Sequence, residues 1–182
     1  MGCFGKCCLA VICWIAQVLQ AAISITIIII VAVHLADYSF DNSNNFQSLC
    51  LLADTGDDSV CNYAYAVAGL SLACNLAMSI LLCFTCNLCG LGPLLETIFN
   101  GFAAVWWVIA ALIFSAYVSE ANDNNYFNDQ ARDWRISIVV LAWVNFGLFT
   151  FIFCVYLGKM VAKICKCCGC CDDDDDKEFD KV

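Results

Sequence analysis

Four long apolar blocks, separated by polar segments, dominate the pattern of the chain. They span roughly residues 8–35, 63–89, 94–119 and 136–158. Each block is longer than the ~20 apolar residues that a helix needs to cross a bilayer. Backbone polar groups in lipid must be hydrogen-bonded within the segment, so such blocks form helices. The pattern predicts an all-α integral membrane protein, a bundle of four helices.

The composition agrees with this fold class. Of 182 residues, 63% are hydrophobic, the mean hydropathy is +0.81 and there is a single proline, whereas soluble domains contain about 45–50% apolar residues. The net charge of −9 leaves no basic face of the kind that binds nucleic acid, so no nucleic-acid partner is expected.

The basic residues near the spans predict the orientation. They are Lys6 before the first span, and Lys159, Lys163 and Lys166 after the fourth. The first long loop is acidic and has no basic residue, so the positive-inside rule places both termini in the cytosol and both long loops outside. Arg132 and Arg135 oppose this assignment, but they lie among acidic residues of the second outer loop, 120–135.

Cysteines cluster at both predicted cytosolic ends, in segment 1–7 and its border with the first span, and in the tail 164–182. The predicted lipidation residues are Gly2, Cys3, Cys7, Cys8, Cys165, Cys167, Cys168, Cys170 and Cys171. Juxtamembrane cysteines in a reducing compartment are the usual S-palmitoylation acceptors, whereas Gly2 meets the myristoylation pattern only in part because residue 6 is Lys. Zinc or copper binding by the tail cysteines is the alternative. The run Asp172–Asp176 is expected to be solvated.

Two cysteines, Cys50 and Cys61, are the only ones on the outer side of the membrane in this topology. An oxidising exterior favours a disulfide between them. The acidic residues nearby do not follow the spacing of a calcium-binding EF-hand loop, so we interpret them as a solvated surface.

A few polar residues interrupt the spans at helical spacing. They are Gln17, Gln20, Asn75, Glu96, Asn100 and Asn145. Polar side chains facing lipid are costly, so these are expected to face other helices and hydrogen-bond between them. Glu96 is the one acidic residue within a predicted span, and such a carboxylate is a candidate functional site. Its place in the first turn of a helix favours a structural role instead, through the helix dipole.

The third block opens with an acidic residue and continues with aromatic and small residues at helical spacing: Glu96, Phe99, Phe102, Ala103, Ala104, Trp106, Trp107, Ala110 and Ala111. In these residues the chain resembles the MARVEL-domain proteins, the group of synaptophysin, synaptogyrin, occludin and the myelin-and-lymphocyte protein. The resemblance would cover residues 8–163. The resemblance implies a membrane-organising or vesicle-trafficking role, cholesterol-rich membranes and no catalysis. The tail CKCCGCC followed by five Asp is outside the pattern of that group.

We therefore expect a non-enzymatic, multi-pass protein of the plasma membrane or of a secretory or vesicle membrane. Its partners would be membrane lipids, cholesterol and anionic lipids among them, and either further copies of itself or other membrane proteins. No cofactor is expected. The alternative is an accessory or pore-forming subunit of a channel or transporter. An intramembrane enzyme would need paired titratable groups, which the spans lack in sequence.

Overall fold

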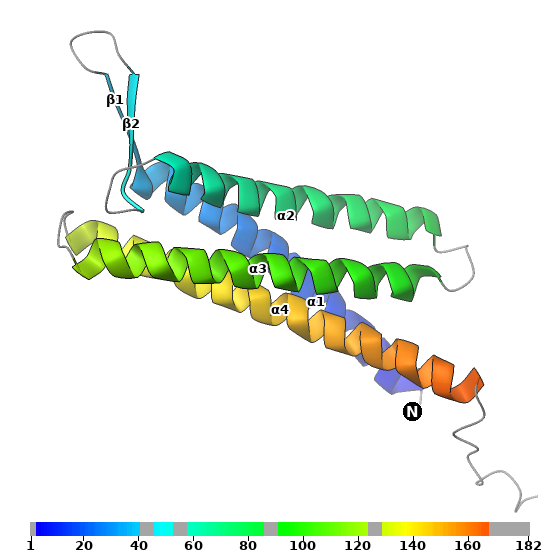
Figure 1. Ribbon diagram of the computed structural model, residues 1–182. Coiled ribbons are helices and arrows are strands. Elements are labelled where there is room, and N and C mark those ends of the chain that lie inside the picture. Colours follow the sequence, from blue (N-terminus) through cyan, green and yellow to red (C-terminus); the bar gives the residue numbers. More distant parts are fainter. Residues whose placement is uncertain (1–2, 41–45, 53–57, 86–90, 124–128, 168–182) are drawn as a thin grey trace, which may run out of the picture.

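Four long helices follow one another in the computed structural model, which describes residues 3–40, 46–52, 58–85, 91–123 and 129–167 (Figure 1). The helices are α1 (Cys3–Ile30), α2 (Asp58–Thr85), α3 (Leu91–Asp123) and α4 (Asp129–Cys167). The start of α1 and the end of α4 lie at one end of the bundle (Figure 1). In the described part, each helix contains a segment long and apolar enough to cross a membrane: Val11–Leu35, Asp58–Leu81, Leu94–Asp123 and Ala131–Ala162. The prediction of four helices that are long and apolar enough to span a membrane is confirmed.

The helices extend beyond the apolar blocks that predict them. α2 begins at Asp58, α3 continues to Asp123 and α4 begins at Asp129. Most of the predicted second outer loop, 120–135, is therefore helical. Charged side chains end a hydropathy block, but they do not end a helix that continues from lipid into water.

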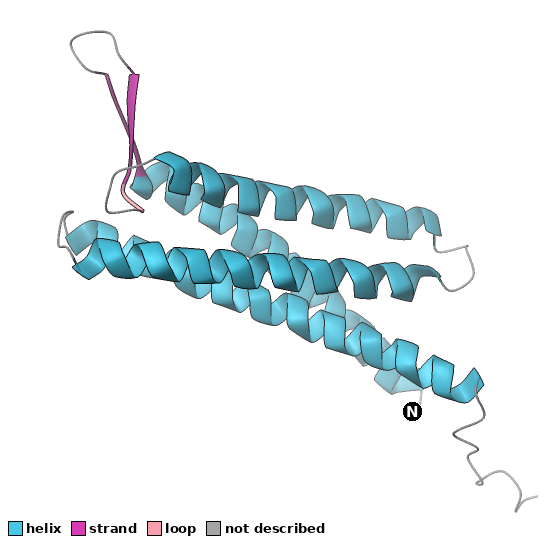
Figure 2. Cartoon of the chain, viewed as in Figure 1, coloured by secondary structure: helices cyan, strands magenta, loops and turns pink. Residues whose placement is uncertain are grey.

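Among the residues that the structure describes, a short β-hairpin in the first loop is the one addition to the helices. β1 (Ala36–Phe40) pairs antiparallel with β2 (Phe46–Cys50), with Ala36 opposite Cys50 and Phe40 opposite Phe46. The two strands extend beyond the helices at the end of the bundle opposite the N-terminus (Figure 2). The polar composition of this loop predicts no strand.

One buried stripe with a repeat of three and four residues holds α3 against α4, the most extensive helix pair. On α4 the buried positions are Ala131, Arg135, Ile138, Ala142, Asn145, Phe149 and Ile152. On α3 they include Thr97, Asn100, Ala104, Trp107, Ala111, Phe114, Val118 and Ala121. Alternating steps of three and four keep one face turned toward the partner, as in left-handed helix packing. At Gly101, an added Cβ would lie 3.1 Å from the Phe153 ring.

The α2 helix packs more on α1 than on α3, although α3 follows it directly in the chain. The two successive helices are joined by a polar contact in their middle, where Trp107 Nε1 donates to Ser71 Oγ at 3.0 Å. Two neighbouring hollows, one polar and one apolar, lie along these two helices.

Candidate functional site

A buried carboxylate in the first turns of α3 is the centre of the candidate site. Glu96 is only 3% exposed, because its position on α3 turns it toward α1. Gln17 Nε2 on α1 donates to Glu96 Oε1 at 3.3 Å. Asn100, one turn further along α3, donates from Nδ2 to Glu96 Oε2 at 3.0 Å. Both carboxylate oxygens therefore accept a hydrogen bond from a neutral carboxamide.

Asn100 also fixes the backbone beneath the carboxylate. Its Nδ2 donates to the Glu96 main-chain oxygen at 2.7 Å, and the side chain is 1% exposed. Because one amide group contacts both the side chain and the carbonyl of Glu96, the carboxylate has a defined orientation. No described basic side chain forms an ion pair with it, although the charge of Lys159 on α4 acts on Glu96.

A cleft of about 210 Å³ lies beside this carboxylate, among α1, α2 and α3. Its polar lining consists of Gln17, Asn75, Ser79, Glu96 and Asn100. Its apolar lining includes Trp14, Leu72, Leu76 and Phe99. Asn75 Nδ2 is inaccessible to solvent and has no hydrogen-bond partner within the described part of the chain, while Ser79 Oγ donates to the Asn75 main-chain oxygen at 2.9 Å.

The chemistry of the cleft follows from its groups. Glu96 is the only carboxylate among its lining residues, so these residues do not offer the pair of titratable groups that general acid–base catalysis commonly uses. A carboxylate with carboxamide and hydroxyl neighbours is instead suited to bind a cation or a group that donates hydrogen bonds.

The remaining polar residues of the spans are placed differently. Gln20 and Asn145 are both 0% exposed, and neither amide has a partner among the described residues. Ser24 Oγ donates to the carbonyl of Gln20 within α1, at 3.0 Å. Of the carboxamides predicted to bond between helices, Gln17 has such a bond in the described structure, and Asn100 binds within its own helix.

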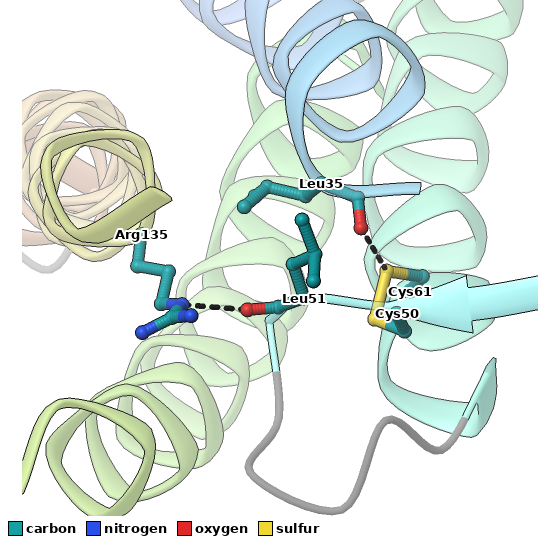
Figure 3. The surroundings of a disulfide bond; sticks show 5 residues. All are labelled: Leu35, Cys50, Leu51, Cys61 and Arg135. Atoms are coloured by element: carbon teal, nitrogen blue, oxygen red, sulfur yellow. Dashed lines mark hydrogen bonds between the residues drawn. A yellow bond between two sulfur atoms is a disulfide. The ribbon is translucent and has the colours of Figure 1, made fainter. Parts of the chain in front are cut away.

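The base of the hairpin is clamped at the opposite end of the bundle (Figure 3). Cys50 and Cys61 form a disulfide, with 5.8 Å between their Cα atoms, which joins the end of β2 to the first turn of α2. The main-chain nitrogen of Leu51 donates to the Leu35 carbonyl at 2.8 Å. Leu35 ends a π-helical turn, Val31–Leu35, which continues α1.

Arg135 completes this clamp from α4, and the sequence reasoning missed it. Its Nε donates to the Leu51 carbonyl at 2.6 Å, and Nη1 donates to Asn122 Oδ1 at 3.0 Å. The residue is 1% exposed, so it is not a solvated loop charge as the predicted loop 120–135 implies. The signal that could have identified it is its register, four residues after Ala131 and three before Ile138 in the buried stripe of α4.

An exposed ring and a half-buried ring, His34 and Trp134, lie next to the clamp residues in the chain. His34 and Trp134 stack with their centroids 3.8 Å apart and an interplanar angle of 6°. Trp134 on α4 therefore has a ring partner on the π-helical turn that continues α1.

The predicted lipidation residues cannot be placed in the same detail. Gly2, Cys168, Cys170 and Cys171 lie outside the described residues. For Cys3, Cys7, Cys8, Cys165 and Cys167 the structure describes helical backbone only. Over the residues that the structure describes, no group of three or more His, Cys, Asp or Glu side chains is placed to hold a metal ion.

Comparison with protein-family models, with curated proteins and with solved structures found no match for this chain.

Proposed function

We propose that this protein is a non-enzymatic membrane protein that organises membrane or assembles into a larger membrane complex, with the β1–β2 hairpin as its outer contact element. The observation that carries the proposal is the anchored base of that hairpin. A disulfide at Cys50, and a backbone hydrogen bond and a buried arginine at Leu51, all hold this short segment.

The anchors fix the direction in which the strands leave the bundle. Cys50 is 1% exposed and Leu52 is 0% exposed, so the hairpin is seated in the core at its base while its strands extend past the helices (Figure 1). A preorganised element loses less conformational freedom on binding than a flexible loop does. A hairpin held in this way is suited to contact a second copy or another membrane protein.

Three expectations from the sequence fit the same proposal. They are the resemblance to MARVEL-domain proteins, the cytosolic position of both termini and the acylation of cysteines near them. Acyl chains near both termini of the chain would add membrane affinity next to the lysines. Mass spectrometry before and after hydroxylamine treatment tests this. Loss of acyl-sized masses from peptides holding residues 3–8 and 165–171 is expected, and free thiols throughout would contradict acylation.

The test of the proposal shortens the hairpin without disturbing its base. Residues 38–48 are replaced by Asn-Gly, a dipeptide that suits two-residue hairpin turns. The paired residues Asp37 and Leu49 then flank the new turn. We expect native mass spectrometry of gently extracted particles to show an oligomer or complex for the natural chain and a monomer for the shortened one. Removal of residues 172–182, a segment of the chain outside the hairpin, is the control.

Two results would refute the proposal. One is a natural chain that is extracted as a monomer. The other is an assembly whose mass falls only by the deleted residues, because the hairpin would then be dispensable for assembly.

A second candidate function is an accessory or pore-forming subunit of a channel or transporter. The observation that favours it is the buried Glu96 carboxylate beside a cleft, since ionisable groups within spans commonly mark ion pathways. Ion flux into liposomes that contain the purified protein, altered by Glu96→Gln, would favour this candidate. Absence of flux would favour the first.

A further inference from the structure

The polar cleft adjoins an apolar groove on the membrane-facing side of α2 and α3. The groove has a volume of about 270 Å³. Its lining includes Leu70, Cys74, Phe102, Ala103 and Trp106. The ring of Phe99 lines both hollows, so the buried carboxylate and the apolar groove are neighbours along the same pair of helices.

One hollow is polar and its neighbour is apolar, which is the combination that a site for an amphiphile requires. In the cleft, Glu96, Gln17 and Asn100 present a carboxylate and carboxamides. In the groove the one polar hydroxyl, Ser71 Oγ, already accepts the hydrogen bond from Trp107. Phe102 is 76% exposed and Trp106 is 39% exposed, so the groove is open to the lipid around the bundle.

The charge of the cleft selects the head group. A buried carboxylate is costly unless a cation or sufficient hydrogen bonds compensate it. Glu96 has two neutral donors and no ion pair with a described residue. Both donors use their amide nitrogen toward Glu96, and Lys159 acts on it without forming an ion pair. An ammonium group is therefore the ligand that would bring a positive charge into contact with the carboxylate while donating further hydrogen bonds to oxygens of the lining.

We propose that this composite site binds a long-chain primary amine, with the ammonium group beside Glu96 and a single alkyl chain in the α2–α3 groove. The inference goes beyond the proposed function and does not use the hairpin, which lies at the other end of the bundle. A neutral or anionic head group would leave the carboxylate uncompensated, so alcohols and carboxylates of equal chain length are poor ligands.

Tryptophan fluorescence provides the test, because Trp14 lines the cleft and Trp106 and Trp107 line the groove. The natural full-length protein in nanodiscs of neutral lipid is titrated with 12-bromododecylamine, whose bromine quenches nearby indoles. Dodecylamine is used as a competitor to separate specific binding from partition into lipid. 12-Bromododecanol and 12-bromododecanoate are the matched probes with neutral and anionic heads.

We expect saturable quenching by the amine that dodecylamine reverses, and at least about tenfold weaker binding of the alcohol and the carboxylate, because they lack the charge-assisted hydrogen bond. Glu96→Gln should reduce the affinity for the amine by a similar factor and remove its preference over the alcohol. The control is Glu120→Gln, which removes an exposed carboxylate from the other end of the same helix and should leave binding unchanged.

A second variant keeps the test decisive if Glu96→Gln does not fold. Cys74→Phe places a ring in the groove at a half-buried position and should weaken amine binding without touching the carboxylate. Equal affinity for the three head groups, quenching that dodecylamine does not reverse, or undiminished binding by the folded variants would overturn the proposal. None of these results bears on the assembly test, which measures the mass of particles after hairpin shortening.

Discussion

Replacement of Arg135 by Met should loosen the base of the hairpin and lower the free energy of unfolding substantially. Methionine has an unbranched apolar side chain of similar length, so it preserves most of the packing between the stem of residue 135 and the residues around it. What is lost is the guanidinium, with bonds of 2.6 Å to the Leu51 carbonyl and 3.0 Å to Asn122 Oδ1. The longer contact to the Ala121 carbonyl, 3.4 Å, adds little.

The magnitude follows from those two short bonds. Hydrogen bonds to charged groups contribute about 1.5–3 kcal/mol each, which gives ~3–6 kcal/mol for the pair. The cost of burying the cation in the natural protein offsets part of this. We therefore expect a loss of about 3 kcal/mol on Arg135→Met.

The assay is SDS titration of the protein in mixed micelles, followed by circular dichroism, together with amide hydrogen exchange. Exchange should accelerate at Leu51, whose nitrogen donates to Leu35, and stay unchanged around Glu96 at the other end. The control is Arg132→Met, which removes the same charge from an exposed position one turn earlier. Ordinary surface substitutions change the free energy of unfolding by no more than about 0.5 kcal/mol. If the free energies of unfolding of the two variants differ by less than this, the bonds of Arg135 do not stabilise the protein and the reasoning is refuted.

Four further substitutions test other parts of the structure. Cys50→Ser should free the thiol of Cys61 and cost ~3 kcal/mol, because the bridge closes a short loop with a sequence separation of 11; alkylation followed by mass spectrometry counts the thiol, and an unchanged count argues against the bridge. Asn145→Leu should stabilise the bundle by ~1–2 kcal/mol, because the buried amide has no partner among the described residues; destabilisation in the SDS titration would mean that the amide has a partner. Gly69→Ala, where nothing lies within 4 Å of the added Cβ, should stabilise α2 by ~0.5–1 kcal/mol. Gly101→Ala should gain less, because Phe153 must shift, and equal effects in thermal unfolding would show that this contact is unimportant.

The spans could be predicted from sequence because lipid imposes a simple rule on them. A block of more than twenty apolar residues has no alternative to a helix in a bilayer, and the described residues of each block are helical. The ends of the helices follow a different rule. Asp58 and Asp133 are acceptable in a helical turn that lies in water, so the hydropathy of the chain contains no signal for where α2 and α4 begin.

The role of Arg135 was hidden for a different reason. Its best partner is the main-chain carbonyl of Leu51, 84 residues away in sequence, and a carbonyl group has no residue type by which it can be recognised. Counting Arg135 as a loop charge also removed it from the helical register of α4. Extending the three-and-four repeat backward from Ile138 would have placed it on the buried face, where a charge requires a partner.

The candidate site shows how far the position of a single residue can be predicted. The sequence indicates that Glu96 faces other helices, since a carboxylate in lipid is costly, but it does not indicate which ones. The short connection between α2 and α3 suggests two helices packed closely along their length. Instead the buried stripe of α3, from Thr97 to Ala121, packs on α4, and α2 packs mainly on α1. Because each of the two successive helices has its main partner elsewhere, their common side remains open, and this separation creates both the cleft at Glu96 and the groove beyond Phe99.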